Sequence, residues 1–152
     1  MAYGAPMPDR KDSQRSMDTI DWPYLKSLLS DEDRIEYNQL KLDPNRGHEF
    51  LITNPALDPV TARNLRVHYI LSTAVAERRI QKTDIYLHDQ FFHELGALRL
   101  KEQRTEEEEE KAMVLEEKLR SIWFKADPEN NSHRLALEYA KRSSKASKRC
   151  VD

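Results

Sequence analysis

The sequence predicts an all-α fold, and three observations support this class. Only three glycines occur among 152 residues, whereas hairpins and barrels need residues that tolerate positive φ at their turns. Apolar residues recur at intervals of three and four, the spacing of one helix face. Asp or Ser residues stand where helix N-caps are needed. We therefore expect a small helical bundle with a long, partly projecting charged helix and flexible termini.

The composition limits both the core and the class of protein. Hydrophobic residues make up 38% of the chain and charged residues 34%, so much of the chain must face solvent or partners. The net charge of −2 gives no general field for nucleic acid or membrane. Cys150 is the only cysteine, which fits a reducing compartment. No stretch approaches the ~20 apolar residues of a membrane span. These features predict an intracellular protein and leave cytoplasm and nucleus open.

The first two predicted helices begin at recognisable caps. Residues 1–17 mix Pro, Gly, Ser and charge and predict a flexible N-terminal arm. A helical core is expected over 18–100. Within it, Asp21 is expected to cap a short helix and Ser30 a second one.

Two further features complete the expected core. The sequence DPNRG (43–47) is expected to end the second helix, and FLIT (50–53) to form an extended connector packed on helices. Asp58 and Pro59 start the best defined helix, predicted over 59–82. The residues expected on its buried face are Val60, Val67, Ile70, Leu71, Ala74 and Val75.

A long helix is predicted next, because no proline follows Thr83 or Asp84 until Pro128. Its first half has a wide apolar face: Ile85, Leu87, Phe91, Phe92, Leu95 and Leu98. Its second half has a narrower stripe of coiled-coil spacing: Ala112, Leu115, Leu119, Ile122 and Ala126. Residues 101–126 are therefore predicted to continue the long helix, with an acidic neck followed by a coiled-coil-like seam.

The neck contains five consecutive glutamates, Glu106–Glu110. Neighbouring like charges repel, so a local break or frayed turn is the alternative to a continuous helix. Beyond the seam, residues 127–152 predict a short terminal helix, capped by Ser132, and a basic tail.

One cluster of potentially reactive groups lies between Asp84 and Glu94. Asp84 and His88 share one side of a helix, while Asp89 and His93 lie roughly 140° away, so at most two metal ligands converge. We expect His88 to be a core histidine whose ring proton is accepted by Asp84, with a pH-sensitive contact as the alternative. No nucleophile motif or phosphate loop is present. We therefore predict no enzyme activity, no catalytic residues, no cofactor and no metal.

The seam is the predicted partner-binding surface, formed by Leu115, Leu119, Ile122, Trp123 and Phe124. Packing within the chain is the alternative for these residues. The basic tail consists of Lys141, Arg142, Lys145, Lys148 and Arg149. It could remain solvated, contact an acidic protein or import receptor, or contact nucleic acid.

Together these features predict a non-enzymatic helical adaptor or assembly subunit. It would bind partner proteins through helix packing, self-association included, and no membrane. The alternative is a nucleic-acid-associated factor that uses the basic tail.

Overall fold

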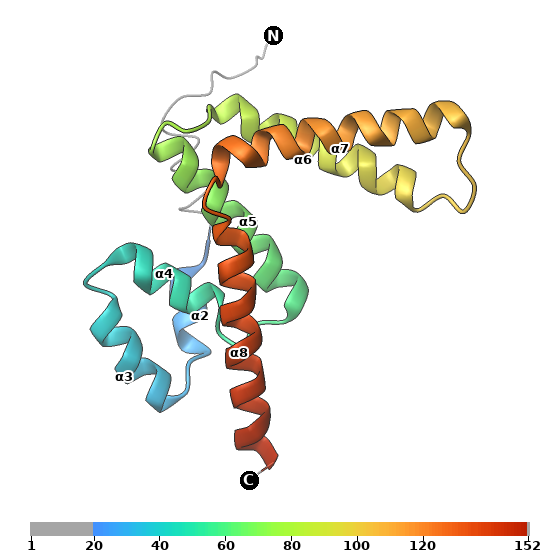
Figure 1. The fold of residues 1–152 in the computed structure, drawn as a ribbon. Helices are drawn as coiled ribbons and strands as arrows, with labels where there is room; N and C mark the ends of the chain where they lie inside the picture. Colours follow the sequence, from blue (N-terminus) through green and yellow to red (C-terminus); the bar gives the residue numbers. More distant parts are fainter. Residues whose placement is uncertain (1–19, 152) are drawn as a thin grey trace. The chain divides into compact units, whose positions relative to one another are not determined.

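The computed structural model describes the backbone of residues 20–151 and the side chains of residues 20–144. Within this range all regular structure is α-helical, which confirms the predicted class (Figure 1). The helices are α2 (Trp22–Ser27), α3 (Asp31–Leu40), α4 (Pro44–Ile52), α5 (Pro59–Ala76), α6 (Lys82–Arg99), α7 (Glu106–Ala126) and α8 (Asn131–Val151). The predicted flexible arm, residues 1–17, lies outside the described residues.

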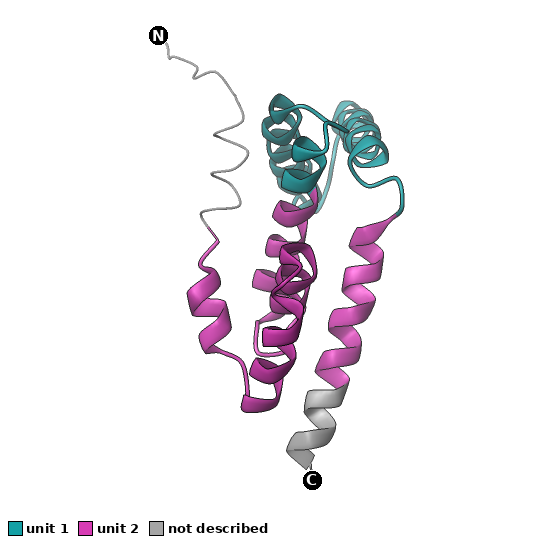
Figure 2. Cartoon of the chain, turned by 90° about the vertical axis from the view of Figure 1, so that its left-hand side faces the viewer, with its two compact units in different colours: residues 1–15, 71–129 teal, residues 16–70, 130–152 magenta. Residues whose placement is uncertain are grey.

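The chain divides into two compact units (Figure 2). Of the described residues, unit 1 contains 71–129, and unit 2 contains 20–70 and 130–151. Helix α5 contributes to both units. Each unit has a core of its own, and each is described separately below.

The first helices of unit 2 start at the predicted caps. The Asp21 carboxylate accepts a hydrogen bond from the backbone N–H of Tyr24 at 2.9 Å, and Pro23 lies in the first turn of α2. The Ser30 hydroxyl accepts one from the N–H of Asp33 at 3.2 Å. Each cap satisfies an N–H group that has no partner within its helix. Both predicted N-caps are confirmed.

Helix α4 corrects two predictions. DPNRG does not simply end a helix: α3 stops at Leu40, and Asp43 caps a new helix with Pro44 in its first turn. The Asp43 carboxylate accepts from the Asn45 N–H at 3.1 Å. Residues 50–52 are consequently helical rather than an extended connector. Proline suits this position because its missing N–H would have no helical partner there.

Helices α2 and α4, the loop before α5 and the start of α5 together enclose the core of unit 2. Its buried side chains are Ile20, Leu25, Leu29, Phe50, Leu51, Leu57 and Ala62. Tyr139 of α8 packs against this cluster, and its hydroxyl donates to the Leu57 carbonyl at 2.8 Å. The aromatic ring therefore joins α8 to the loop between α4 and α5.

Helix α5 begins as predicted but ends six residues early. The Asp58 carboxylate accepts from the Thr61 N–H at 2.9 Å. At the other end Arg78 has φ 63°, and the N–H of Arg79 donates to the Ala74 carbonyl at 2.8 Å. Together with the bond from the Arg78 N–H to the Val75 carbonyl, this forms a Schellman stop. Because arginine rather than glycine occupies the left-handed position, the sequence did not mark this end.

The buried face of α5 was predicted largely correctly. Ile70, Leu71 and Ala74 are buried. The prediction for Val60 is wrong, since its side chain lies in the first turn of α5 and is 63% exposed. Ala62 and Tyr69, which were not predicted, are buried as well.

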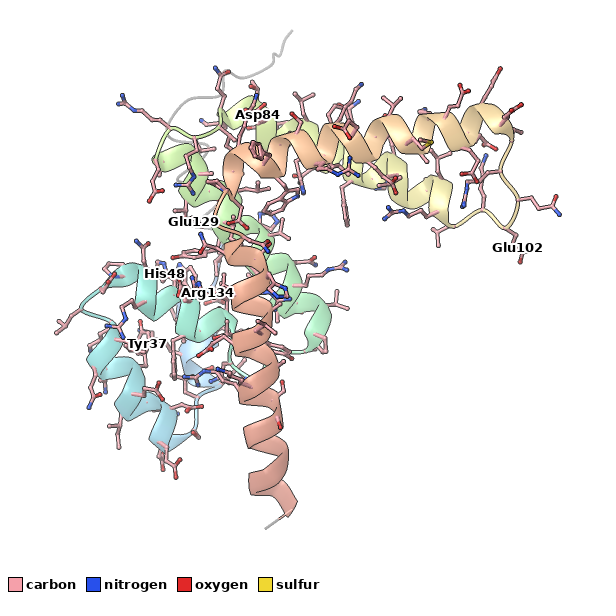
Figure 3. The ribbon with its side chains drawn as sticks, viewed as in Figure 1. Tyr37, His48, Asp84, Glu102, Glu129 and Arg134 are labelled. Atoms are coloured by element: carbon pink, nitrogen blue, oxygen red, sulfur yellow. The ribbon has the colours of Figure 1, made fainter. Side chains whose placement is uncertain are left out.

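The predicted long helix is interrupted, which is the main correction to the fold. Helix α6 ends at Arg99 and α7 begins at Glu106. The loop between them contains Glu102 (Figure 3). The Thr105 hydroxyl accepts from the Glu108 N–H at 3.1 Å, and the Glu108 carboxylate accepts from the Thr105 N–H at 2.9 Å. This capping box places the five glutamates in the first turns of α7, where carboxylates favour the helix dipole.

Helices α6 and α7 form an antiparallel hairpin, the centre of unit 1. Its core contains Leu95 and Leu98 of α6 and Leu115 and Leu119 of α7, with Phe91 and Ala112 at the border. At the end of the hairpin remote from the loop, Arg79 Nε donates to the Ala126 carbonyl at 3.1 Å. A cation there suits the C-terminal end of α7. Parts of the two predicted apolar stripes thus pack on each other, while Leu87 and Phe92 of the first stripe are 40% and 52% exposed.

The terminal helix is longer than predicted. Helix α8 has 21 residues and continues to Val151, so the predicted basic tail is helical rather than a separate segment. After Pro128 the sequence contains neither proline nor glycine, and its lysines, arginines and alanines favour helix.

The capping box predicts a measurable loss when its hydroxyl is removed. Thr105→Ala should lower the free energy of unfolding of unit 1 by about 1 kcal/mol, whereas Thr105→Ser should retain most of it. Urea denaturation in a Trp22→Phe background would measure this, because Trp123 is then the only tryptophan and lies in unit 1. Equal stability of the alanine and serine variants would contradict the cap.

Candidate functional site

Most residues of the predicted partner-binding seam lie inside the hairpin. Leu115, Leu119 and Ile122 are 3%, 9% and 8% exposed. The reversal at the α6–α7 loop gives Leu115 and Leu119 neighbours on α6, and a role of these residues in binding a partner stays a prediction. The alternative of packing within the chain therefore holds for these three residues.

Trp123 lies at one edge of the same hairpin, in contact with a buried histidine. His88 is 4% exposed. Its ring stacks on Phe92, with centroids 5.9 Å apart, and meets Trp123 edge to face at 5.4 Å. Phe92 is 52% exposed and Trp123 is partly exposed. We call Phe92 and Trp123, with His88 between them, the aromatic edge.

The predicted partner of His88 is wrong. Its Nδ1 lies 3.2 Å from the Asp89 carboxylate, while the Asp84 carboxylate accepts from the Gln81 N–H at 2.8 Å. Asp84 lies in the first turn of α6 (Figure 3), where a carboxylate is most favourable to the helix dipole. His88 is nevertheless the buried histidine that the sequence predicted.

Exposed apolar side chains concentrate on this hairpin. The chain's described residues include 12 large hydrophobic side chains that are exposed, and 7 of them lie between Tyr86 and Phe124. Phe124, at 74% exposed, is the only residue of the predicted seam that faces solvent fully. A two-helix hairpin can bury only one stripe of each helix, so its other apolar residues remain available to a partner.

Sequence reasoning missed the exposure of Phe92, which it placed on the buried face. Phe91 and Phe92 are adjacent and so differ by about 100° around the helix. Phe91 lies at the border of the hairpin core, where Lys118 Nζ is 5.0 Å from the centre of its ring. The adjacent pair was a signal that one ring would lie off the core.

The described part of the basic tail is only partly free. Arg142 packs its guanidinium over the Phe50 ring at 3.9 Å, and its Nη2 donates to Glu36 at 3.0 Å. The same guanidinium lies 3.8 Å from the buried Asp33 carboxylate. Arg142 thus holds α8 against α3 and α4, and little of its charge is available to nucleic acid.

The other tail residues differ from Arg142 in what the structure describes. Lys141 is exposed. The side chains of Lys145, Lys148 and Arg149 lie outside the described residues. The proposed contacts of these four residues stay predictions.

A polar pocket of about 290 Å³ surrounds the contacts of α8 with α3 and α4. Arg134 makes two hydrogen bonds to Glu49, at 3.2 and 2.9 Å, and these raise the pKa of Arg134. Arg142 and Glu36 line the same pocket. Opposite charges are already paired here, so the pocket is best explained as the ionic attachment of α8 to α3 and α4 within unit 2.

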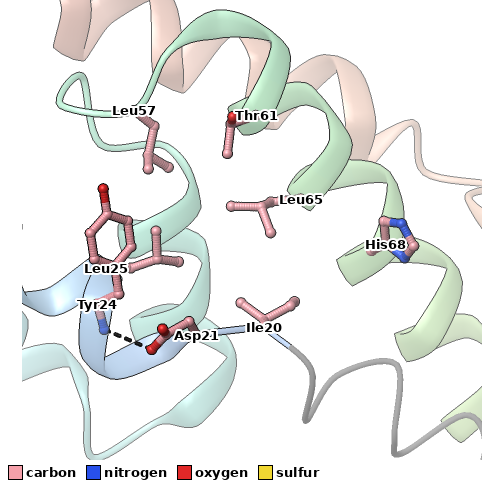
Figure 4. A pocket seen from close by; sticks show the side chains of 8 residues that line it. All are labelled: Ile20, Asp21, Tyr24, Leu25, Leu57, Thr61, Leu65 and His68. Carbon is pink, nitrogen blue, oxygen red and sulfur yellow. Dashed lines mark hydrogen bonds between the residues drawn. The ribbon is translucent and has the colours of Figure 1, made fainter.

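An apolar pocket of about 310 Å³ lies elsewhere in unit 2 (Figure 4). It is lined by Ile20, Asp21, Tyr24, Leu25, Leu57, Thr61, Leu65 and His68. Asp21 is engaged in capping α2, and the Thr61 hydroxyl donates to Asp58 at 2.7 Å. Asp21 and Thr61 therefore serve the helix starts, and the pocket volume is at the lower limit for small-molecule sites.

Three aromatic rings join α2, α4 and α5 in unit 2. His48 stacks on Trp22 with centroids 3.9 Å apart and planes 5° from parallel, and meets Tyr69 edge to face at 6.3 Å. His48 Nδ1 is buried without a hydrogen-bond partner. Burial lowers the pKa of His48 from its ordinary 6.5. Burial likewise raises the pKa of Tyr69, to about 12.

Among the described residues, no group of three or more His, Cys, Asp or Glu side chains is placed to hold a metal ion. No helix in this part of the chain has both the length and the apolar character needed to cross a membrane.

The fold and these surfaces define an all-α protein with a two-helix hairpin. Comparisons with protein-family models, curated proteins and solved structures found no match, so no function is carried over from a relative.

The partly buried ring of His48 predicts an acid sensitivity of unit 2. Because the folded state lowers the pKa of His48, the unfolded chain binds the proton more readily. Stability present above the unfolded pKa is then lost as the pH falls through the folded pKa. Urea denaturation at pH values of about 7.5 and 5.5, in a Trp123→Phe background, would report on Trp22. Between these two pH values, the free energy of unfolding should fall more for the protein with His48 than for the His48→Phe variant. Equal falls would contradict the assignment of the acid sensitivity to His48.

Proposed function

We propose that this chain is a non-enzymatic helical adaptor or assembly subunit that binds partner proteins through the α6–α7 hairpin, inside the cell. The single observation that carries the proposal is the aromatic edge, where Phe92 is 52% exposed and Trp123 is partly exposed. Aromatic side chains dominate binding energy at protein interfaces, because they bury large area with little loss of conformational freedom.

Neighbouring side chains hold the two rings of the aromatic edge in place. His88 contacts both rings, and the buried side chains of Leu119 and Ile122 lie in the same part of α7. On the same edge Arg99 pairs with Glu116 across the hairpin. Rings held in place before binding lose less entropy when a partner arrives. A partner that presents the apolar face of a helix, with a charged border, fits this edge.

Substitution of Phe92 should separate binding from folding. Phe92→Ala removes a half-exposed ring, and Tyr86→Ala is the matched control, because Tyr86 is 50% exposed on the same helix and lies roughly 120° around from Phe92. Tagged chain would be cross-linked in its native extract and its partners quantified by mass spectrometry. The amount of each partner cross-linked to the wild type should fall at least about tenfold with Phe92→Ala. The same amount should persist with Tyr86→Ala.

Salt distinguishes this proposal from the nucleic-acid alternative. A complex held by the basic tail should weaken steeply between about 50 and 200 mM salt, whereas an apolar contact changes little. Partners that are insensitive to Phe92→Ala but lost at the higher salt would contradict the adaptor proposal. Circular dichroism of both variants would verify that the helices are retained.

A further inference from the structure

A second exposed surface runs along α7 on the side away from α6. It consists of Met113, Glu117, Arg120 and Phe124, which we call the outer stripe. Met113 and Phe124 are 67% and 74% exposed, and the side chains of Glu117 and Arg120 are 70% and 67% exposed. At about 100° per residue the four lie within roughly 60° of one another, opposite Leu115 and Leu119.

The outer stripe has the spacing of a coiled-coil seam. Its members follow one another at intervals of four, three and four residues. This is the alternating three-and-four spacing that also occurs in the apolar stripe of α7 facing α6, but here the residues lie on the exposed side of the helix. Met113 and Phe124 begin and end the stripe, and the charged pair lies between them. Large apolar side chains at such positions are normally covered by a second helix.

The stripe is complementary to itself when two copies run antiparallel. Residues 113 and 124 are equally distant from the middle of the stripe, and so are residues 117 and 120. A two-fold axis at that middle therefore brings Met113 against Phe124 of the second copy, and Glu117 against Arg120 of the second copy. Each contact occurs twice, as in any isologous interface.

Charge selects this orientation over the parallel one. A parallel pair of α7 helices would place Glu117 against Glu117 and Arg120 against Arg120, and like charges across an interface are unfavourable. In a single chain Arg120 and Glu117 pair with each other. The antiparallel arrangement exchanges two local ion pairs, one in each copy, for two ion pairs between chains, and it covers four apolar side chains.

We infer that the outer stripe of α7 binds a second copy of this chain, with the two α7 helices antiparallel. This inference rests on the proposed function, since it names one partner of the hairpin, but it uses a different face from the aromatic edge. Four side chains from each copy bury less than the ~1,600 Å² of a standard interface. The dimer is therefore weak and reversible, and it forms at high local concentration.

Charge reversal tests both the surface and the orientation. Glu117→Arg leaves only positive charge at the middle of the stripe, and Arg120→Glu leaves only negative charge. Each variant alone should associate at least about tenfold more weakly than the wild type. Mixed together they should form a heterodimer, because each position then meets its opposite charge. Glu107→Arg is the matched control, the same charge change at an exposed position on another face of α7.

Analytical ultracentrifugation of the purified full-length chain, from about 5 to 500 µM, would measure these equilibria. A wild type that stays monomeric throughout overturns the inference and leaves binding at the aromatic edge unaffected. Equal association of wild type and both single variants places the dimer elsewhere and also overturns it. Weakened single variants that fail to combine overturn the charge pairing of residues 117 and 120 between copies, and with it the inference.

Discussion

The start of α7 at Thr105 is the constraint on which unit 1 depends. The reciprocal hydrogen bonds between Thr105 and Glu108 begin a helix just where the glutamate run would otherwise repel along a continuing one. Arg104 donates from Nε to Glu109 at 2.7 Å and from Nη1 to the Leu98 carbonyl at 3.3 Å, which ties the end of α6 to the start of α7. The chain can then reverse, and two stripes that cannot share one side of a straight helix bury each other.

The sequence predicted the helices better than their ends. Asp21, Ser30 and Asp58 were identified as caps, because a cap is a local signal readable from a few neighbouring residues. The same Asp-Pro signal at Asp43 was read as a stop, since the glycine of DPNRG pointed to a turn. The end of α5 at Arg78 could not be read, because the left-handed position there carries no glycine. The capping box at Thr105 was present in the sequence, but nothing local showed that the chain reverses.

The candidate surfaces were predictable only in part. The seam spacing correctly identified the apolar stripe of α7, but periodicity does not say which helix will cover a stripe. Arg142 shows the same limit for a charged residue, because its partners Asp33 and Glu36 are about a hundred residues away in the chain. Such pairs follow from tertiary packing, which residue spacing does not encode. Leu115, Leu119 and Ile122 of the predicted seam are consequently buried, and the aromatic edge and the outer stripe are the surfaces that we propose for binding.

The hairpin itself is the central claim, and one distance tests it most directly. Spin labels at residues 86 and 125, in a Cys150→Ser background, would lie on adjacent antiparallel helices whose axes are about 8–10 Å apart. Pulsed electron paramagnetic resonance should then give a distance, label arms included, that is short compared with the length of either helix. A single continuous helix would separate the same positions by roughly 58 Å at 1.5 Å per residue. A distribution centred near that longer value would contradict the reversal at Thr105 and both surfaces built on it.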